Sequence, residues 1–445
     1  MTDPSTTDDL ETLAAHAYLY AFPLVFNLEQ VERFVTTGVG TLGAGPFNTF
    51  THARTLATPA DDFVSVNNDT VYSIAQLDLS EGPIRLHVPD SAGRYYVLQF
   101  VDAWTDNFAY VGKRATGTAE GEFLVAPPGW SGEPDADATV IHAPTDIVSV
   151  IGRWACDGES DLPAVHALQD AMHLSTRQAP QGREIPAASA STPALEYWEK
   201  FRVWSQAFPP ASRDLAVQAT FEPLGLAGST PVDDLSDETK TILEAGYAKG
   251  VATLDSILTS GGSPVVNGWQ LTLHIFDYNL DFFEVGALDD PRWKIEDPAT
   301  RYPARAAAAK AGLWGNHGYE AAYFMTYLDH AGEQLTGDRE YSLRLSPPPP
   351  VGAFWSVTMY ALPDFYLVDN EIERYSIGDR TPGIIADDDG GVTLTMSASR
   401  PSDAKALANW LPAPDAAFRP ILRMYIPGEA VLDGSYVPPA ITRAG

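Results

Sequence analysis

Cysteine is nearly absent from this sequence of 445 residues, where Cys156 is the only one. A single cysteine excludes an intramolecular disulfide framework and a cysteine-rich zinc site, which suits a reducing compartment. No apolar run approaches the roughly 20 residues that a membrane-spanning helix needs. The acidic first residues also lack the basic start and the apolar segment of a secretory signal. We therefore expect a soluble cytoplasmic protein that does not enter a membrane.

Basic residues are also scarce, since 28 Lys and Arg stand against 59 Asp and Glu and give a net charge of -31. The sequence has no cluster of basic residues that could bind a phosphate backbone or an anionic membrane. This composition argues against nucleic acid and membrane surfaces as partners. A small-molecule ligand and a homo-oligomer stay open.

The common catalytic signatures are missing as well. The sequence has no G-x-S-x-G nucleophile elbow, no H-E-x-x-H zinc helix, no P-loop and no dinucleotide-binding G-x-G-x-x-G. Serine hydrolases of the usual α/β type, zincins and nucleotide-dependent enzymes are therefore disfavoured. We expect no cofactor.

One short stretch has the spacing of a metal site. His166, Asp170 and His173 stand at i, i+4 and i+7, so on a helix they would share one face and offer two imidazoles and a carboxylate. The same offsets are typical of an ordinary solvated helix. A second set, His274, Asp277 and Asp281, lies in a segment of undecided conformation. We predict no metal site from either set.

The length exceeds the roughly 250 to 300 residues at which one hydrophobic core stops growing, which predicts two or three domains. Residues 1–60 are expected to form a helical segment, which Pro23 should kink or interrupt. Residues 61–155 change to short alternating runs separated by turns, a pattern typical of an antiparallel β-sandwich or jelly roll. The runs are IRLHV, YYVLQFVDAW, FAYVGKR, EFLVAP and ATVIHAP.

The middle of the chain, residues 156–335, has mainly helical periodicity. Helices are expected over 161–174, 194–208, 237–262, 302–315 and 318–332, with a strand-containing segment at 267–280. Residues 336–445 return to a period of two and predict a second β-sandwich. The fold class is therefore α+β and strand-dominated, with two antiparallel, jelly-roll-like sandwiches, a helical N-terminal segment and a helical middle region.

The two strand-rich regions resemble each other in sequence. Tyr95-Tyr96 and Phe354-Trp355 each open a strand, and an arginine follows each strand region, at Arg114 and at Arg380. We interpret these regions as two similar domains.

Several segments also resemble a known bacterial arrangement. The segments VNNDTVYSIAQLDL, VPDSAGRYYVLQFVDAWTDNFAYVGKRATG, APPGW and APTDIVSVIGR resemble domain of unknown function 1254. The segments RYPARAAAAKAGL, PPVGAFWSVTMY, NEIERYSIGDR and LRMYIP resemble its usual companion, domain of unknown function 1214. The resemblance implies β-sandwich domains joined by helices and implies no particular reaction.

Polar residues stand at the start of one predicted strand and along another. Asp69 and Asp102 are candidate general bases, with Tyr72 and Tyr96 as candidate acids or hydrogen-bond donors. The ordinary explanation is that these groups satisfy one another at a corner of the sandwich, because buried polar groups usually have partners. Further candidates for contact with a substrate are Asn68, Gln99, Asn107, Arg305, Tyr323, Trp355, Tyr360 and Arg374.

Among the C-terminal candidates, Arg374 could hold a carboxylate with two parallel hydrogen bonds. Tyr319, Tyr323 and Tyr327 recur every four residues, which predicts the buried stripe of a helix. Trp355 and Tyr360 could line a pocket, although an aromatic core, with a structural ion pair for Arg374, is the ordinary explanation.

Three functions remain open on this evidence. The first is a cofactor-independent enzyme, a hydrolase, lyase or isomerase, that acts on a small organic molecule in a cleft between the domains. The second is a non-catalytic protein that binds a small molecule or saccharide. The third is an assembly protein whose sandwiches pack into an oligomer.

Overall fold

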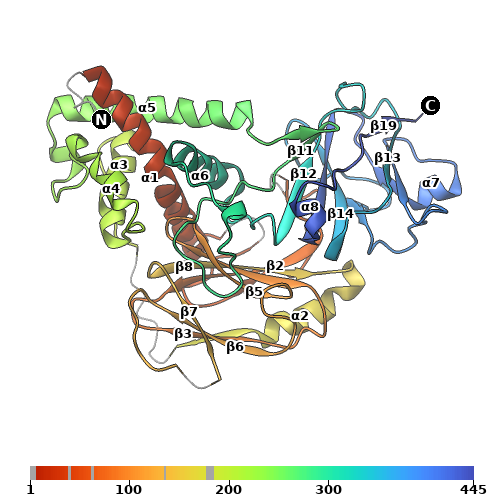
Figure 1. The fold of residues 1–445 in the computed structure, drawn as a ribbon, viewed down its shortest axis with the longest axis horizontal. Helices are drawn as coiled ribbons and strands as arrows, with labels where there is room; N and C mark the ends of the chain where they lie inside the picture. Colours follow the sequence, from red (N-terminus) through yellow and green to blue (C-terminus); the bar gives the residue numbers. More distant parts are fainter. Residues whose placement is uncertain (1–6, 39–41, 62–64, 135–136, 177–184, 445) are drawn as a thin grey trace.

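A computed structural model describes residues 7–38, 42–61, 65–134, 137–176 and 185–444. Most of the helical residues gather on one side of the molecule, and two groups of sheets lie beside and below them (Figure 1). The helices are α1 (Thr7–Thr36), α2 (Leu162–Ala171), α3 (Pro193–Ala207), α4 (Leu215–Ala219), α5 (Asp237–Ser260), α6 (Pro298–Gly312), α7 (Ala404–Ala408) and α8 (Glu429–Leu432). In the parts of the chain that the structure describes, no helix has the length and apolar character to cross a membrane.

The first helix is continuous across its proline. The sequence predicts that Pro23 kinks or interrupts the helix, and the interruption is wrong, because α1 includes Pro23 in its interior. The middle of α1 is buried in a core that also takes Trp198 of α3, Leu243 of α5 and Ala306 of α6. Packing on three neighbours therefore outweighs the loss of one backbone hydrogen bond. Residues 1–6 of the expected helical segment lie outside the described part of the chain.

The first β unit consists of strands β2 to β9 in two sheets, and the short strand β1 extends one of them. One has the order β1-β2-β8-β4-β5 and the other β7-β6-β3-β9. Leu77 of β2 and Leu86 of β3 belong to one hydrophobic core, so the two sheets share their buried side chains. The strands are β1 (Thr51–His52), β2 (Thr70–Asp78), β3 (Ile84–Val88), β4 (Tyr96–Asp102), β5 (Asn107–Gly112), β6 (Gly121–Ala126), β7 (Thr139–His142), β8 (Ile147–Ala155) and β9 (His173–Thr176).

The second β unit consists of strands β12 to β19 in two sheets, and the short strands β10 and β11 extend one of them. Their orders are β10-β11-β12-β18-β14-β15 and β17-β16-β13-β19. Phe324 of β12 and Leu343 of β13 lie in its single hydrophobic core. The strands are β10 (Val265–Val266), β11 (Trp269–Leu271), β12 (Ala321–Met325), β13 (Tyr341–Leu345), β14 (Val351–Ala361), β15 (Ser376–Gly378), β16 (Val392–Ser397), β17 (Trp410–Pro412), β18 (Phe418–Pro427) and β19 (Thr442–Arg443).

The two units have the same topology. The order β2-β8-β4-β5 in the first unit corresponds to β12-β18-β14-β15 in the second, and β7-β6-β3-β9 corresponds to β17-β16-β13-β19. In each unit the pairing is antiparallel except at one equivalent place, where β6 pairs with β7 and β16 with β17 in parallel. The similarity that the sequence shows around Tyr95 and Phe354 is therefore part of a structural repeat. The domain boundaries expected at residues 60, 155 and 335 stay a prediction.

One predicted helix is a strand. The sequence favours a helix over 318–332, but Ala321–Met325 form β12 and pair with β18. Tyrosines four residues apart share a face of a helix, yet four is an even number and also keeps them on one face of a strand. The tyrosine spacing could not separate these two structures.

Candidate functional site

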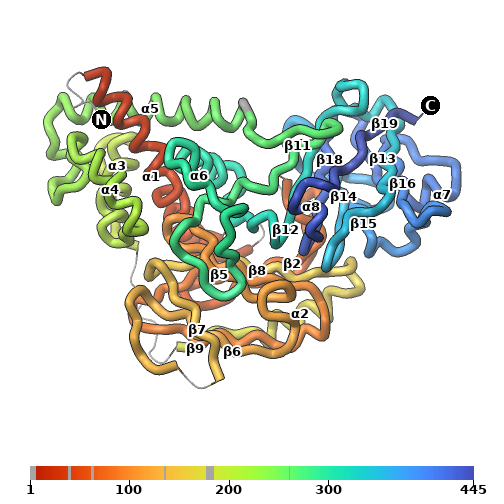
Figure 2. Tube along the Cα trace, viewed as in Figure 1, coloured from red at the N-terminus to blue at the C-terminus, as the bar shows by residue number. Residues whose placement is uncertain are grey.

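The two β units meet through the sheet faces that do not form their own cores. Successive residues of a strand point to opposite faces of its sheet. In β14, Trp355 and Val357 lie in the core of the second unit, whereas the ring of Phe354 lies 5.7 Å from that of Tyr95 in the first unit. We call this region, where β2, β8 and β4 face β12, β18 and β14, the junction. Figure 2 shows β2 and β8 beside β12 and β14.

Two arginines occupy equivalent positions in the junction. Arg153 pairs with Tyr72 across β8 and β2, and Arg423 pairs with Tyr323 across β18 and β12. Each guanidinium lies near the ring of its tyrosine, at 5.4 Å for Arg153 and 5.9 Å for Arg423. Both arginines are buried, and neither forms an ion pair with a carboxylate in the described ranges. Burial disfavours an unpaired charge, so these two cations need strong polar partners.

Polar partners from both units surround Arg153. Its Nη1 donates to Oε1 of Gln99 at 2.9 Å, and its Nη2 donates to the carbonyl of Trp314 at 2.7 Å. Gln99 in turn donates to Asn107 at 2.7 Å and to the carbonyl of Gly315 at 2.7 Å. The structure therefore brings the predicted residues Gln99 and Asn107 together with the segment that leads into β12.

Arg423, in the second unit, makes similar contacts to a segment of the first unit. Its Nη1 donates to Oγ1 of Thr358 at 2.8 Å, and its Nη2 donates to the carbonyl of Ser65 at 3.0 Å and to the hydroxyl of Tyr360 at 2.8 Å. Tyr360 donates to the carbonyl of Val66 at 2.6 Å. Each arginine thus binds the segment that precedes the first strand of the other unit. The Nε of Arg423 has no acceptor among the described residues.

Asp69 immediately precedes β2 and is buried in the junction. Its Oδ2 accepts hydrogen bonds from Ser356 at 2.6 Å and from Tyr425 at 3.1 Å, and its Oδ1 accepts one from Ser376 at 3.4 Å. Its backbone N–H donates to Oδ1 of Asn67 at 2.6 Å. Asp69 is therefore a residue of a local corner, and its carboxylate also faces the second unit.

The two asparagines before Asp69 fix this corner. Asn67 donates to the hydroxyl of Tyr425 at 2.7 Å, and Asn68 donates to the carbonyl of Ala57 at 2.6 Å. Burial and the neighbouring carboxylate of Asp69 raise the pKa of Tyr425 well above its ordinary value. Tyr425 consequently keeps its proton and can donate it in the hydrogen bond to Asp69.

Glu320 is the residue of the second unit that corresponds to Asp69, because it immediately precedes β12. The two carboxylates differ in their partners. Arg114 donates to Oε2 of Glu320 at 2.5 Å in an ion pair, and Tyr95 donates to Oε1 at 3.1 Å. Arg380, which stands where Arg114 does, donates to the backbone carbonyl of Asp69 at 3.2 Å instead. In the described parts of the chain, Asp69 forms no ion pair with Lys or Arg. The two units therefore differ in how the carboxylate at this position is paired.

Asp102 and Arg305, two other predicted residues, belong to a separate buried cluster between the β4–β5 turn and α6. Arg305 forms an ion pair with Asp106 at 2.8 Å and lies 5.1 Å from the ring centroid of Tyr278. Oδ1 of Asp102 accepts a hydrogen bond from the backbone N–H of Asp106 at 2.8 Å. Burial and the charge of Asp106 raise the pKa of Asp102 well above its ordinary range. Asp106 is therefore paired with the guanidinium of Arg305, whereas burial and the charge of Asp106 disfavour the ionised form of Asp102.

Three predicted residues lie outside both clusters. Tyr96 points into the core of the first unit, where its ring stacks on Trp154 at 4.8 Å. Trp355 points into the core of the second unit. Arg374 donates to backbone carbonyls, including that of Trp410 at 2.9 Å. Strand alternation separates Tyr96 and Trp355 from their neighbours Tyr95 and Ser356, which do face the junction.

The first metal candidate is divided between two elements. α2 ends at Ala171, and His173 begins β9, so the three side chains do not share one helix face. Asp170 forms an ion pair with Arg54 at 2.6 Å, and Nε2 of His166 lies 2.8 Å from the carbonyl of Arg54. No group of three or more His, Cys, Asp or Glu suited to a metal ion occurs within the described ranges.

The second metal candidate is divided in a similar way. His274 pairs with Asp277 at 2.6 Å. Asp281 instead pairs with Arg213 at 3.0 Å. The three side chains therefore serve two separate contacts.

The junction residues that sequence reasoning missed include Arg153, Ser356, Arg423 and Tyr425. All four lie within strands that are otherwise largely apolar. A charged residue in such a strand indicates a polar contact or a site, because a charge is rarely buried without a polar partner. The contacts themselves depend on how the two units pack, which strand patterns do not specify.

Each β unit matches a described protein family over part of its length. Residues 47–176 match the family described as protein of unknown function DUF1254, and residues 320–429 match the one described as DUF1214. The first range covers most of the first β unit and the second range most of the second unit. The chain therefore has a DUF1254 match followed by a DUF1214 match, which confirms the resemblance that its segments show. No curated protein matches the chain.

Solved structures similar to the chain include the following two. The crystal structure of the VPA0106 protein from Vibrio parahaemolyticus shares 24% identity, covers 99% of this chain and 100% of that one, and has a TM-score of 0.74. This likeness shows a common fold. A structure of an uncharacterized protein from Burkholderia cenocepacia shares 12% identity, covers 97% and 88% of the two chains, and has a TM-score of only 0.44.

Proposed function

We propose that the protein is a cofactor-independent enzyme, a hydrolase, lyase or isomerase, that acts on a small organic molecule at the junction. One observation carries this proposal. The carboxylate of Asp69 is buried between the two units and is bound by hydroxyl groups, without a Lys or Arg ion pair in the described part of the chain. At the equivalent position Glu320 is neutralised by Arg114.

In this proposal Asp69 is the general base, because its carboxylate is bound by hydroxyl groups and is not engaged in an ion pair with Lys or Arg in the described part of the chain. Tyr425 is the hydrogen-bond donor that orients it. Arg153 and Arg423 bring two positive charges to the same region, which supports a substrate that carries a carboxylate or another anionic group. Tyr72 and Tyr323 beside these arginines would contact its body.

A non-catalytic binding protein for a small organic acid is the second candidate. The two arginines without carboxylate partners favour it, since anion binding would neutralise them and needs no general base. The two candidates differ in the role of Asp69, which only catalysis requires.

Turnover measurements test the proposal directly. The purified protein is incubated with a panel of small hydroxy acids, lactones and esters, and ¹H NMR follows each compound without added cofactor. We expect conversion of at least one class, and a loss of about 100-fold or more in Asp69→Asn, as for removal of a general base. Asp388→Asn, at an exposed turn position, is the matched control and should keep full activity.

Two outcomes would refute catalysis by Asp69. Equal rates for the wild type and Asp69→Asn would remove the base from the mechanism. Binding without conversion of any compound would support the second candidate instead.

We also propose that each unit is a β-sandwich of the jelly-roll type, which the single core shared by each pair of sheets supports. A cytoplasmic location belongs to the same proposal and is supported by the single cysteine, Cys156.

A further inference from the structure

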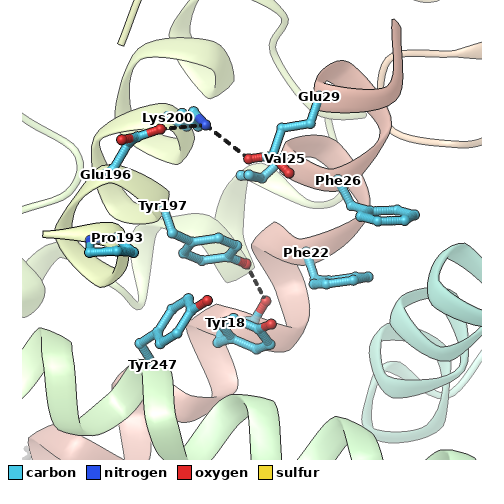
Figure 3. A pocket seen from close by; sticks show the side chains of 10 residues that line it. All are labelled: Tyr18, Phe22, Val25, Phe26, Glu29, Pro193, Glu196, Tyr197, Lys200 and Tyr247. Carbon is cyan, nitrogen blue, oxygen red and sulfur yellow. Dashed lines mark hydrogen bonds and ion pairs between the residues drawn. The ribbon is translucent and has the colours of Figure 1, made fainter. Parts of the chain in front are cut away.

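Three helices enclose a cavity that lies outside the junction. It has a volume of about 260 Å³ and is lined by side chains of α1, α3 and α5 (Figure 3). This volume lies just below the roughly 300 to 1,000 Å³ of sites for drug-sized ligands, so a smaller molecule would fit. Five aromatic rings contribute to the lining: Tyr18, Phe22, Phe26, Tyr197 and Tyr247.

Close packing of α5 on α1 positions these rings. A Cβ atom added to Gly246 would lie 2.2 Å from Cβ of Ala14, and one added to Gly250 would lie 2.5 Å from Cβ of Tyr18. Only glycine therefore permits this approach at both positions. Tyr247, between the two glycines, lies with its ring perpendicular to that of Tyr18 at a centroid distance of 5.3 Å.

The remaining wall comes from α3. The ring of Tyr197 stacks on Tyr18 at 4.7 Å, and its hydroxyl donates to the backbone carbonyl of Tyr18 at 2.8 Å. Figure 3 shows the rings of Tyr18, Tyr197 and Tyr247 grouped around one end of the cavity. The faces of aromatic rings are electron-rich and attract cations.

Charged side chains stand at the other end of the cavity. Lys200 forms ion pairs with Glu29 at 2.9 Å and with Glu196 at 2.7 Å. Two carboxylates thus share one ammonium group and leave one negative charge in excess. The side chains of Glu29 and Glu196 are 37% and 40% exposed, so a solvated ligand can reach them.

We propose that this cavity binds a small monovalent organic cation with an apolar body, such as an alkyl- or arylammonium ion. The apolar body would contact the rings, and the cation would lie between the ring faces and the excess carboxylate charge. An anion would meet net negative charge, and Lys200 already has two partners. The proposal concerns α1, α3 and α5 and does not depend on the function proposed for the junction.

Calorimetric titration of the whole chain tests the charge requirement. The probes are benzyltrimethylammonium, choline and 3,3-dimethyl-1-butanol, the last being a neutral molecule with the shape of choline. We expect both cations to bind, and choline to bind at least about fivefold more tightly than its neutral analogue, as cation–π contacts imply. Equal affinities of choline and the alcohol, or no heat of binding from either cation up to about 10 mM, would overturn the proposal.

Variants locate the binding site. Tyr247→Leu removes the ring and should weaken benzyltrimethylammonium binding about fivefold or more, whereas Tyr247→Phe keeps the ring and should bind within about twofold of the wild type. Glu196→Gln, at a partly exposed position, should weaken binding and leave the fold intact. Glu238→Gln removes one charge from the exposed start of α5 and serves as the control. Unchanged affinity in both Tyr247→Leu and Glu196→Gln would show that the cation binds elsewhere.

Discussion

The carboxylate of Asp69 accepts a 2.6 Å hydrogen bond from the hydroxyl of Ser356, which lies 287 residues later in the chain. This bond joins the residue before the first strand of one β unit to the third strand of the other. The equivalent carboxylate, Glu320, is joined to the first unit by an ion pair with Arg114. One repeat position thus has a charge-neutralised carboxylate and the other a carboxylate bound only by neutral donors.

The bond between Asp69 and Ser356 should stabilise the junction. Asp69→Asn replaces a carboxylate oxygen that accepts two hydroxyl hydrogen bonds with part of an amide. We therefore expect the free energy of unfolding to fall by about 1 to 3 kcal/mol. Ser356→Ala should also destabilise the protein. The double variant should lose less than the sum of the two, with a coupling of about 0.5 to 3 kcal/mol. Urea denaturation of the four proteins measures this cycle.

Asp388→Asn, with an exposed side chain, provides the control and should change the stability by less than about 0.5 kcal/mol. Strictly additive effects of Asp69→Asn and Ser356→Ala would mean that the two side chains do not interact in solution.

Much of the strand content follows from the sequence alone. The segment IRLHV matches β3 at Ile84–Val88, because alternation and flanking turns define a half-buried strand. The helix expected over 237–262 is α5 (Asp237–Ser260), capped by the side chain of Ser236. Local patterns are sufficient where an element has one buried face or a clear cap.

Local patterns fail where the tertiary structure decides. α1 continues through Pro23 because its neighbours bury that turn. β12 contains Tyr323, whose spacing from other tyrosines fits a helix equally well. The candidate site shows the same limit, since Asp69 is identifiable from its polar segment whereas Arg423 and Tyr425 become its neighbours only when the units pack.

The cluster around Arg305 should respond unequally to the loss of its members. Arg305→Met leaves the carboxylate of Asp106 buried without its ion-pair partner, so we expect a loss of about 3 to 5 kcal/mol of stability. Asp102→Asn should change the stability by less than about 1 kcal/mol, because burial and the charge of Asp106 already disfavour the ionised form of Asp102 and the amide has the same shape. Chemical denaturation at pH 7 compares the two. A large loss in Asp102→Asn would mean that Asp102 is ionised.

Two glycines at equivalent positions of the repeat should tolerate no side chain. A Cβ on Gly112 would lie 2.3 Å from the carbonyl oxygen of Tyr96, and one on Gly378 would lie 2.0 Å from that of Trp355. Each strand pair would have to separate, so Gly112→Ala and Gly378→Ala should each lose at least about 1 to 3 kcal/mol. Gly262→Ala, which meets no atom within 4 Å, is the control and should be neutral. Thermal unfolding followed by circular dichroism distinguishes these outcomes.

His317 should make the protein sensitive to mild acid. The hydroxyl of Tyr110 lies 2.8 Å from its Nδ1 and that of Tyr319 lies 3.0 Å away, inside a fully buried cluster. Burial and the nearby charge of Arg114 lower the pKa of His317 to about 3. Between this value and the ordinary pKa of about 6.5, the unfolded chain binds a proton that the folded chain excludes. The free energy of unfolding should therefore fall as the pH drops below about 6.5, by up to about 1.4 kcal/mol per pH unit from this residue.

The variant His317→Asn isolates this contribution. Asparagine can place an acceptor near the two tyrosine hydroxyls but does not titrate, so its stability should depend less steeply on pH. Urea denaturation of both proteins at pH 7, 6 and 5 gives the difference between the two slopes, in which the carboxyl groups common to both cancel. The slope of the wild type should exceed that of the variant most between pH 6 and pH 5, and the two slopes should converge toward pH 7, because only the wild type loses stability through His317. Parallel pH profiles would mean that His317 takes up a proton as readily in the folded protein as in the unfolded chain.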